Sequence, residues 1–179
     1  METEVKIMAW ERVARVTPGE TTQTPLYPAV GKAVEAWTNV MDELPMLMDK
    51  LIGSGMAYRG VWSLNDDVAQ KAAQIRFLGR NDADIPQSTK DRIIALANSL
   101  DQASQRWGDI AHGRASSYTD GNSTPYFYWM PSPNDGLRMG SSYPESYLYW
   151  WTSAQILNYA GKFGQLRTEV LAVIQLLGP

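Results

Sequence analysis

A long helical pattern ends in the sequence RWGDIAHG, residues 106–113. The pattern begins near Thr89, and its apolar side chains recur at the three- and four-residue spacing of a helix that is buried along one side. These side chains are Ile93, Ile94, Leu96, Ala97, Leu100, Ala103 and Trp107. We therefore expect one amphipathic helix from about Thr89 to Ala111, stopped by Gly113.

Similar patterns predict two helices before this one. The first opens at Pro28 and carries apolar residues as far as Leu44, where Pro45 is expected to kink it or to start a new turn. The second is expected between an N-cap at Ser63 and a closing glycine at Gly79. A last helix should follow a cap at Thr152 or Ser153 and run nearly to the end of the sequence.

The stretch that leads to this last helix is rich in Ser, Tyr, Pro, Gly and Asn. Residues 126–130 and 147–151 are aromatic, β-prone runs, so we expect them to pair as a two-stranded ribbon. These aromatic side chains either pack in the core or offer a platform on which RNA bases stack. The predicted fold is all-α, an up-and-down bundle of four to five helices with a small β-ribbon between the last two long helices.

Composition bounds the class of protein. A chain of 179 residues, 44% of them hydrophobic, is long enough for one domain with a substantial core. We assign residues 1–26 as an N-terminal extension and residues 27–179 as the helical bundle domain. The net charge of −3 excludes a generally basic surface, so RNA binding would require a local basic patch.

The chain has no Cys and a single His, which argues against disulfides, a thiolate nucleophile and a transition-metal site. We therefore expect neither a metal nor a cofactor. No apolar run approaches the roughly 18 residues that span a bilayer, and the first residues lack the apolar stretch of a signal peptide. The expected location is the cytoplasm, without membrane contact.

The only histidine, His112, is the first candidate for acid–base catalysis, because imidazole is the side chain whose unperturbed pKa lies near neutrality. Arg106 could clamp a phosphate with its planar fork of donors, and Asp109 could orient or stabilise the imidazole. Arg106 precedes His112 by six helical positions, about 120° around the helix. A histidine at a helix end also interacts with the last carbonyls and the helix dipole, so this structural role stays open.

Three further arginines are candidates for phosphate or RNA binding. Arg114 follows the histidine closely, although a cation is also favoured there by the dipole at a helix C-terminus. Arg76 and Arg80, four residues apart, could extend a basic strip or could simply form a solvated helix face.

The order of these features resembles the HEPN superfamily, in particular bacterial members whose third helix ends in a motif like Arg-Asn-Asp-Ile-Ala-His-Gly. Residues 109–113, DIAHG, match that motif outright. The Ala36-Trp37 pair in the first helix also fits, as do the aromatic segment that ends at Pro131 and the sequence YWWTSAQI at 149–156. The resemblance covers roughly residues 27–177.

The resemblance implies a helical bundle that pairs as a homodimer, with the Arg and His of each chain near the shared interface. Many members are metal-independent ribonucleases acting as toxins or in antiviral defence, and others are non-catalytic binding or scaffold modules. Trp107 and Gly108 occupy the positions of the Arg and Asn of close relatives. Arg106, with five residues between it and His112, stays within the superfamily's spacing of four to six.

Two functions follow. The first is a non-catalytic nucleic-acid- or protein-binding module acting as a homodimer, which the acidic charge, Trp107 and the missing Asn favour. The second is a metal-independent endoribonuclease of toxin or defence type, with an antitoxin protein as a further partner. Cleavage through the 2′-hydroxyl needs a base and an acid, which two copies of His112 would supply across a two-fold axis.

Overall fold

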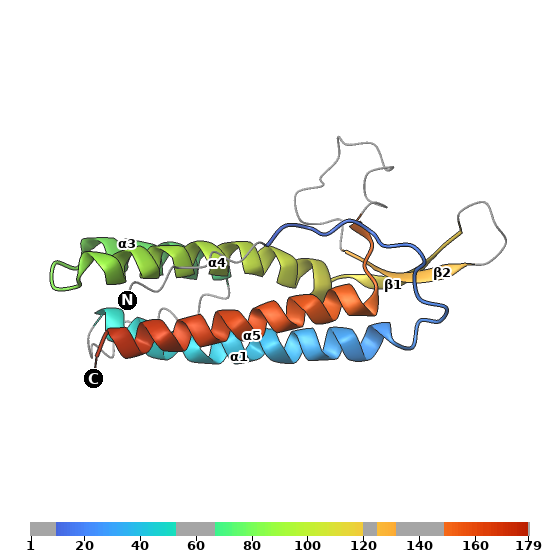
Figure 1. Cartoon of the computed structure of the whole chain (residues 1–179). Helices are drawn as coiled ribbons and strands as arrows, with labels where there is room; N and C mark the ends of the chain where they lie inside the picture. The colour runs from blue at the N-terminus through green and yellow to red at the C-terminus, as the bar shows by residue number, and fades with distance from the viewer. Residues whose placement is uncertain (1–9, 53–66, 120–124, 132–148, 179) are drawn as a thin grey trace. The chain divides into compact units, whose positions relative to one another are not determined.

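The structure is a computed structural model that describes residues 10–52, 67–119, 125–131 and 149–178. It is mostly helical, with a two-stranded ribbon before the last helix (Figure 1). The prediction of a helical chain with a ribbon between its last two long helices is thereby confirmed. The elements in chain order are α1 (Leu26–Ile52), α3 (Val68–Asn81), α4 (Gln87–Ala111), β1 (Arg114–Tyr118), β2 (Tyr126–Met130) and α5 (Ser153–Leu176).

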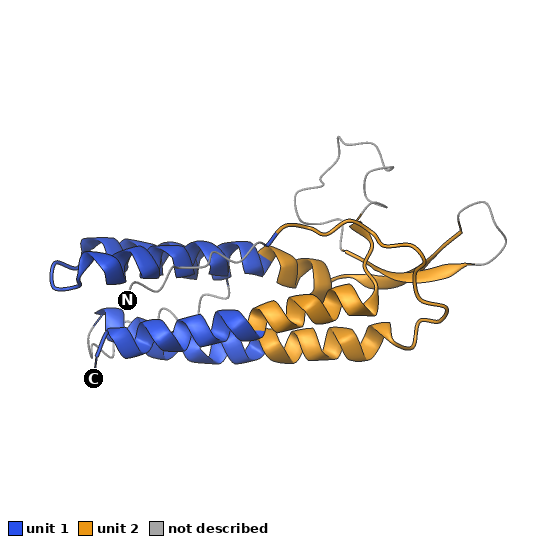
Figure 2. Cartoon of the chain, viewed as in Figure 1, with its two compact units in different colours: residues 1–10, 38–104, 164–179 blue, residues 11–37, 105–163 orange. Residues whose placement is uncertain are grey.

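The chain divides into two compact units (Figure 2). Unit 1 consists of residues 1–10, 38–104 and 164–179, and unit 2 of residues 11–37 and 105–163. Helices α1, α4 and α5 contribute residues to both. Residues 11–25, which the sequence assigns to an N-terminal extension, therefore belong to the same unit as the ribbon and the end of α4.

Unit 1 has an aliphatic core. Its buried side chains come from α1, α3, α4 and α5, and they include Val40, Leu44, Leu47, Leu51, Ile75, Ile93, Leu96, Leu100, Leu166 and Val170. Their spacing along each helix is that of a one-sided apolar stripe. Burial of this stripe, rather than helix propensity alone, is what stabilises helices of this length in water.

The predicted end of α3 at Gly79 is wrong, because the helix continues to Asn81. Gly79 is buried, and a Cβ at this position would lie 2.4 Å from Cγ2 of Ile93 on α4. The glycine therefore serves close packing of two helices instead of ending one of them.

The N-cap of α3 is Asp67, whose side chain accepts hydrogen bonds from the backbone N–H groups of Ala69 at 2.9 Å and Gln70 at 3.4 Å. Ser63, the expected cap, lies outside the described residues. Pro45 does not start a new helix, since α1 runs as one helix from Leu26 to Ile52 with the proline inside it.

Unit 2 has an aromatic core. Trp37 of α1 stacks on Trp107 of α4, with ring centroids 6.0 Å apart and an interplanar angle of 14°. Phe163 of α5 meets the same Trp37 edge-on at 5.2 Å. Trp107 is therefore a packing residue in this chain.

The ribbon pairs β1 with β2, antiparallel, in a register that sets Arg114 opposite Met130, Ser116 opposite Tyr128 and Tyr118 opposite Tyr126. Residues 126–130 form a strand as predicted, but its strand partner is β1 and not the run 147–151. From that run only Trp151 pairs, through an isolated bridge to Trp129, and residues 147 and 148 lie outside the described residues. The sequence RASSY of β1 does not alternate between apolar and polar residues, so it carries no pattern that predicts a strand. Its pairing with β2 depends on the hairpin between them.

Helix α5 begins with the predicted cap. The backbone N–H of Thr152 donates to Oε1 of Gln155 at 3.0 Å, and the N–H of Gln155 donates to Oγ1 of Thr152 at 3.4 Å. This reciprocal pair is a capping box. The carboxylate of Glu20 accepts a further bond from the N–H of Ser153 at 2.9 Å, which places a negative charge at the positive end of the helix.

Candidate functional site at the end of helix α4

His112 and Arg114 are exposed at the point where α4 gives way to β1. The backbone N–H of His112 donates to the carbonyl of Gly108 at 3.1 Å, which continues the helical pattern for one residue past Ala111. Among the described residues, the imidazole makes no hydrogen bond or ion pair. Both side chains are therefore accessible to a ligand or to another protein.

Asp109 lies one turn earlier and is entirely buried, with a side-chain exposure of 0%. Its carboxylate oxygens accept two hydrogen bonds from Arg12, Nε to Oδ2 at 3.0 Å and Nη2 to Oδ1 at 2.5 Å. The Nη1 atom of Arg106 lies 3.0 Å from the same Oδ2. We call Arg12, Asp109 and Arg106 the ion cluster.

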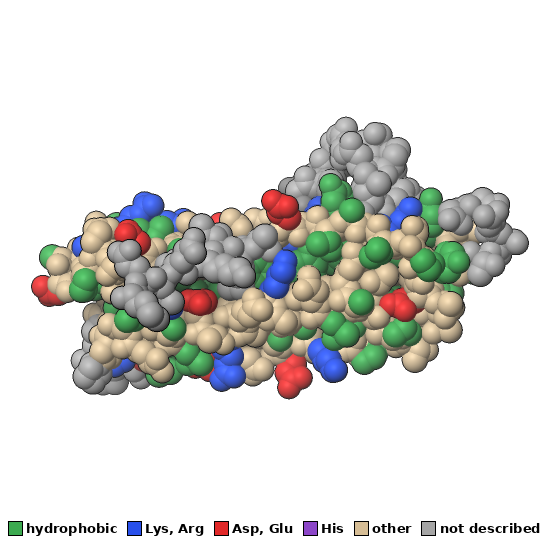
Figure 3. Space-filling view, viewed as in Figure 1, with side chains coloured by type: hydrophobic (Ala, Val, Ile, Leu, Met, Phe, Trp, Pro, Cys, Tyr) green, Lys and Arg blue, Asp and Glu red, His purple; other side chains and the backbone are tan. Residues whose placement is uncertain are grey.

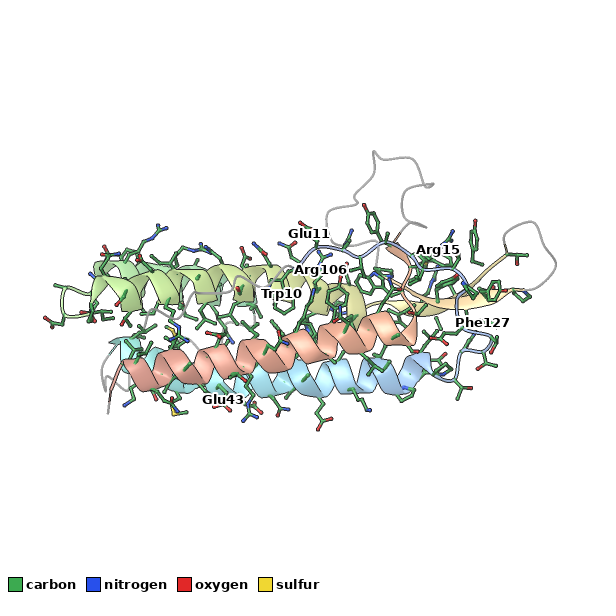
Figure 4. The ribbon with its side chains drawn as sticks, viewed as in Figure 1. Trp10, Glu11, Arg15, Glu43, Arg106 and Phe127 are labelled. Carbon is green, nitrogen blue, oxygen red and sulfur yellow. The ribbon has the colours of Figure 1, made fainter. Side chains whose placement is uncertain are left out.

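The ion cluster is shielded from solvent. The side chain of Arg106 is 9% exposed and that of Arg12 is 17% exposed. Charge-assisted hydrogen bonds in such surroundings are stronger than at the surface, and a bidentate arginine also fixes geometry. Figure 4 shows Arg106 on α4 close to the N-terminal segment that carries Glu11 and Arg15.

The ion cluster changes the expected role of Asp109. Its two oxygens are engaged by guanidinium groups, and among the described residues no hydrogen bond joins it to His112. The sequence suggested that Asp109 orients or stabilises the imidazole of His112, but its observed partners are the arginines Arg12 and Arg106. What Asp109 does in this structure is hold Arg12 and Arg106.

Tyr159 of α5 borders the ion cluster. Its hydroxyl donates to the carbonyl of Glu11 at 2.7 Å and accepts from the N–H of Val13 at 3.2 Å. Burial raises the pKa of Tyr159 above the usual value of 10.0, while the Val13 hydrogen bond and the charge of Arg106 act in the opposite direction. Tyr159 is thus a neutral phenol that anchors the N-terminal segment.

The N-terminal segment, residues 11–20, is the part of the site that sequence reasoning missed. This segment contacts Asp109 and Tyr159, as described above. In addition, the carbonyl of Val13 accepts a hydrogen bond from Nε1 of Trp151 at 3.2 Å. The carbonyl of Ala14 accepts from Nε2 of Gln155 at 2.7 Å, and Glu20 bridges to Phe127 of β2. No sequence signal marks these contacts, because they join positions that are far apart in the chain and carry no periodicity.

Gly113 follows the end of α4 at Ala111, where the sequence predicts the helix to stop, and its close contacts require a glycine. A Cβ at this position would lie 2.2 Å from Nε1 of Trp129 and 2.8 Å from the carbonyl oxygens of Asp109 and Met130. The same Trp129 Nε1 donates to the carbonyl of Ile110 at 3.1 Å, so the indole satisfies one of the last carbonyls of α4. The glycine is required by close approach.

The aromatic residues of the ribbon are packed. Tyr128 and Trp151 are fully buried and Trp129 and Trp150 nearly so, which supports packing over the base-stacking platform for these four. Arg15 covers the ring of Tyr118, with its guanidinium carbon 4.0 Å from the ring centroid.

The two remaining candidates belong to unit 1. The side chain of Arg76 donates from Nε to Oδ1 of Asn98 at 3.0 Å, and Arg80 is exposed in the last turn of α3. The candidate site described above is built from residues of unit 2, so it does not include either arginine.

The described ranges contain no group of three or more His, Asp or Glu residues that could hold a metal ion. None of the helices in these ranges combines the length and the apolar character needed to cross a bilayer. Comparison of the chain with models of protein families, with curated proteins and with solved structures finds no match.

Proposed function

We propose that this chain is a homodimeric, HEPN-like binding module that does not cleave RNA. The observation that carries the proposal is the state of Arg106. A phosphate clamp must present its donors to a ligand, whereas this guanidinium is buried and paired with a buried carboxylate. Withdrawing it would leave Asp109 with Arg12 alone, and breaking buried ion pairs is strongly destabilising.

The described part of unit 2 carries a small excess of basic side chains. On the face in Figure 3, basic and acidic side chains are interspersed, as expected for a chain with a net charge of −3. Among the described residues of unit 2, however, basic side chains outnumber acidic ones. The basic residues are Arg12, Arg15, Lys32, Arg106, Arg114 and Lys162, and the acidic ones are Glu11, Glu20, Glu35 and Asp109.

At the end of α4 the accessible basic residue is Arg114, which is exposed together with His112. An arginine at this place offers a phosphate or a carboxylate a planar set of donors without the loss of a buried ion pair. The binding surface is therefore Arg114 with His112, and the ion cluster supports it from within.

Binding without cleavage is tested with labelled single-stranded RNA in EDTA. Fluorescence anisotropy should show salt-sensitive binding that Arg114→Ala weakens. The control Arg80→Ala, which removes an exposed arginine of unit 1 outside the site, should leave binding nearly unchanged. The RNA recovered from the bound samples should keep its full length. Degraded RNA, or binding that is independent of Arg114, contradicts the proposal.

A second candidate function is the metal-independent endoribonuclease, because one observation favours it. His112 is exposed and makes no side-chain hydrogen bond among the described residues, so a second copy could approach it. In that case His112 is the acid and base, and Arg114 is the accessible cation. RNA cleavage in EDTA that His112→Ala abolishes supports this function over the first.

A further inference from the structure

The two strands of the ribbon differ in how their outer edges are covered. The N–H and C=O groups of Phe127 exchange hydrogen bonds with Glu20 at 2.8 and 3.0 Å. Those of Trp129 exchange bonds with Trp151 at 2.7 and 2.9 Å. The outer edge of β2 is therefore occupied by two segments that are distant in sequence.

The outer edge of β1 is open among the described residues. In an antiparallel pair, successive residues point their backbone groups to alternate sides. Since Phe127 and Trp129 point away from β1, Tyr128 points toward it, and so does its partner Ser116. The N–H and C=O groups of Ala115 and Ser117 then point outward, and no backbone hydrogen bond is found for them there.

This open edge is accessible and lacks the usual protection. Ser117 is exposed and Ala115 is half-buried. Natural edge strands are often blocked by proline, lysine or a bulge, yet β1 is a regular strand with the sequence RASSY. Its central side chains are small, so a second backbone can approach without steric conflict.

We propose that β1 pairs with β1 of a second copy of this chain, antiparallel, about a two-fold axis at Ser116. Ala115 of each copy then lies opposite Ser117 of the other, and each of these pairs exchanges both backbone hydrogen bonds. The inference rests on the homodimer of the proposed function and assigns its interface to a strand edge.

Side-chain chemistry favours a second copy in this register. Arg114 of one copy lies opposite Tyr118 of the other, so the two like charges do not face each other across the axis. The two Arg114 side chains stay apart at opposite ends of the paired strands. The pairing also joins the two ribbons into one four-stranded sheet. Because β1 follows α4 directly, His112 of each copy then lies next to one of the two central strands.

A five-residue strand buries little area, so the dimer is expected to be weak and to dissociate on dilution. Sedimentation velocity over a range of concentrations should show wild type passing from monomer to dimer. Ser117→Pro removes an outward N–H at a position where an edge strand tolerates proline. It should weaken dimerisation about tenfold or more, since two interchain hydrogen bonds are lost. Ser117→Thr keeps the N–H and should dimerise like wild type.

Hydrogen exchange of the wild-type protein gives a readout that does not depend on a variant's folding. The amides of Ala115 and Ser117 should exchange more slowly at high protein concentration than at low concentration. If Ser117→Pro dimerises as strongly as wild type, the inference is overturned. The interface would then have to lie on another surface, such as one that includes the exposed apolar residues Tyr27, Val34 and Leu157. A wild type that stays monomeric also overturns it. A monomeric wild type also removes the homodimer from the proposed function, whereas RNA binding without cleavage is tested separately by the anisotropy measurement.

Discussion

Arg12 and Asp109, 97 positions apart in the sequence, are joined by two hydrogen bonds between guanidinium and carboxylate. This pairing ties the N-terminal segment to the last turns of α4, directly before His112. Because Arg106 contacts the same carboxylate at 3.0 Å, the buried anion stabilises two cations together. The end of α4 is therefore held by a residue from a distant part of the chain.

Arg12→Ala should lower the free energy of unfolding by about 2–3 kcal/mol, because two charge-assisted hydrogen bonds to a buried acceptor are lost. Arg12→Lys should recover only part of this, since an ammonium cannot reproduce the bidentate geometry. Urea unfolding followed by tryptophan fluorescence measures both. A double-mutant cycle with Asp109→Asn should give a coupling energy of at least about 1 kcal/mol.

The matched control is Arg167, which pairs with Glu43 in unit 1 and has a side chain 45% exposed. Arg167→Ala should cost less than about 1 kcal/mol, as exposed ion pairs do. Equal losses for Arg12→Ala and Arg167→Ala would show that the ion cluster has no special structural role.

Gly79→Ala should destabilise the protein although alanine is the better helix former. The added methyl group would meet Ile93 at 2.4 Å, and overpacking of this kind costs about 1–3 kcal/mol. Gly161→Ala is the control, because its Cβ meets nothing within 4 Å and the helix gains up to about 1 kcal/mol. Thermal unfolding should therefore shift down for the first variant and up for the second; shifts of the same sign contradict the packing described for α3 and α4.

Gly113→Ala should destabilise the turn between α4 and β1 by about 1–3 kcal/mol, since the new Cβ collides with Trp129 and with two carbonyl oxygens. The near-ultraviolet circular dichroism of the tryptophans should change along with stability. Gly31→Ala, in an open position of α1, should leave that signal as it is. An unchanged spectrum and stability for Gly113→Ala would argue against the close approach.

Tyr159 predicts a loss of stability at alkaline pH. Burial raises its pKa in the folded state above 10.0, so the folded chain holds the phenolic proton more tightly than the unfolded chain. The stabilising contribution is complete below about pH 10 and disappears as the pH rises through the higher folded-state pKa. Tyr159→Phe has no such proton, so its stability relative to that of wild type should rise above about pH 10. Parallel pH profiles of the two proteins in urea unfolding would contradict this.

Helical periodicity predicted much of the fold. The apolar stripe from Ile93 to Trp107 located α4 to within a few residues of its observed bounds, Gln87–Ala111. The cap at Thr152 located the start of α5 in the same way. These features are local, because a helix is specified by residues three and four positions apart.

The errors arose where distant contacts decide the structure. Gly79 looked like a helix end, yet its reason is a methyl group on a neighbouring helix. The strand β1 was missed because its pairing with β2 depends on a hairpin, not on its own sequence pattern. Arg12 gave no signal, since nothing near it in sequence identifies Asp109 as its partner.

The most direct test of the central claim, that Arg106 is committed to the ion cluster and the chain does not cleave RNA, is a product assay. Wild type and His112→Ala are incubated with 5′-labelled RNA in EDTA, at protein concentrations above and below the dissociation constant of the dimer. The 2′,3′-cyclic phosphate ends of the RNA are then quantified. Our account predicts no cyclic-phosphate product from wild type above the level found with His112→Ala. Product that accumulates with wild type, rises with dimer concentration and vanishes in His112→Ala contradicts it.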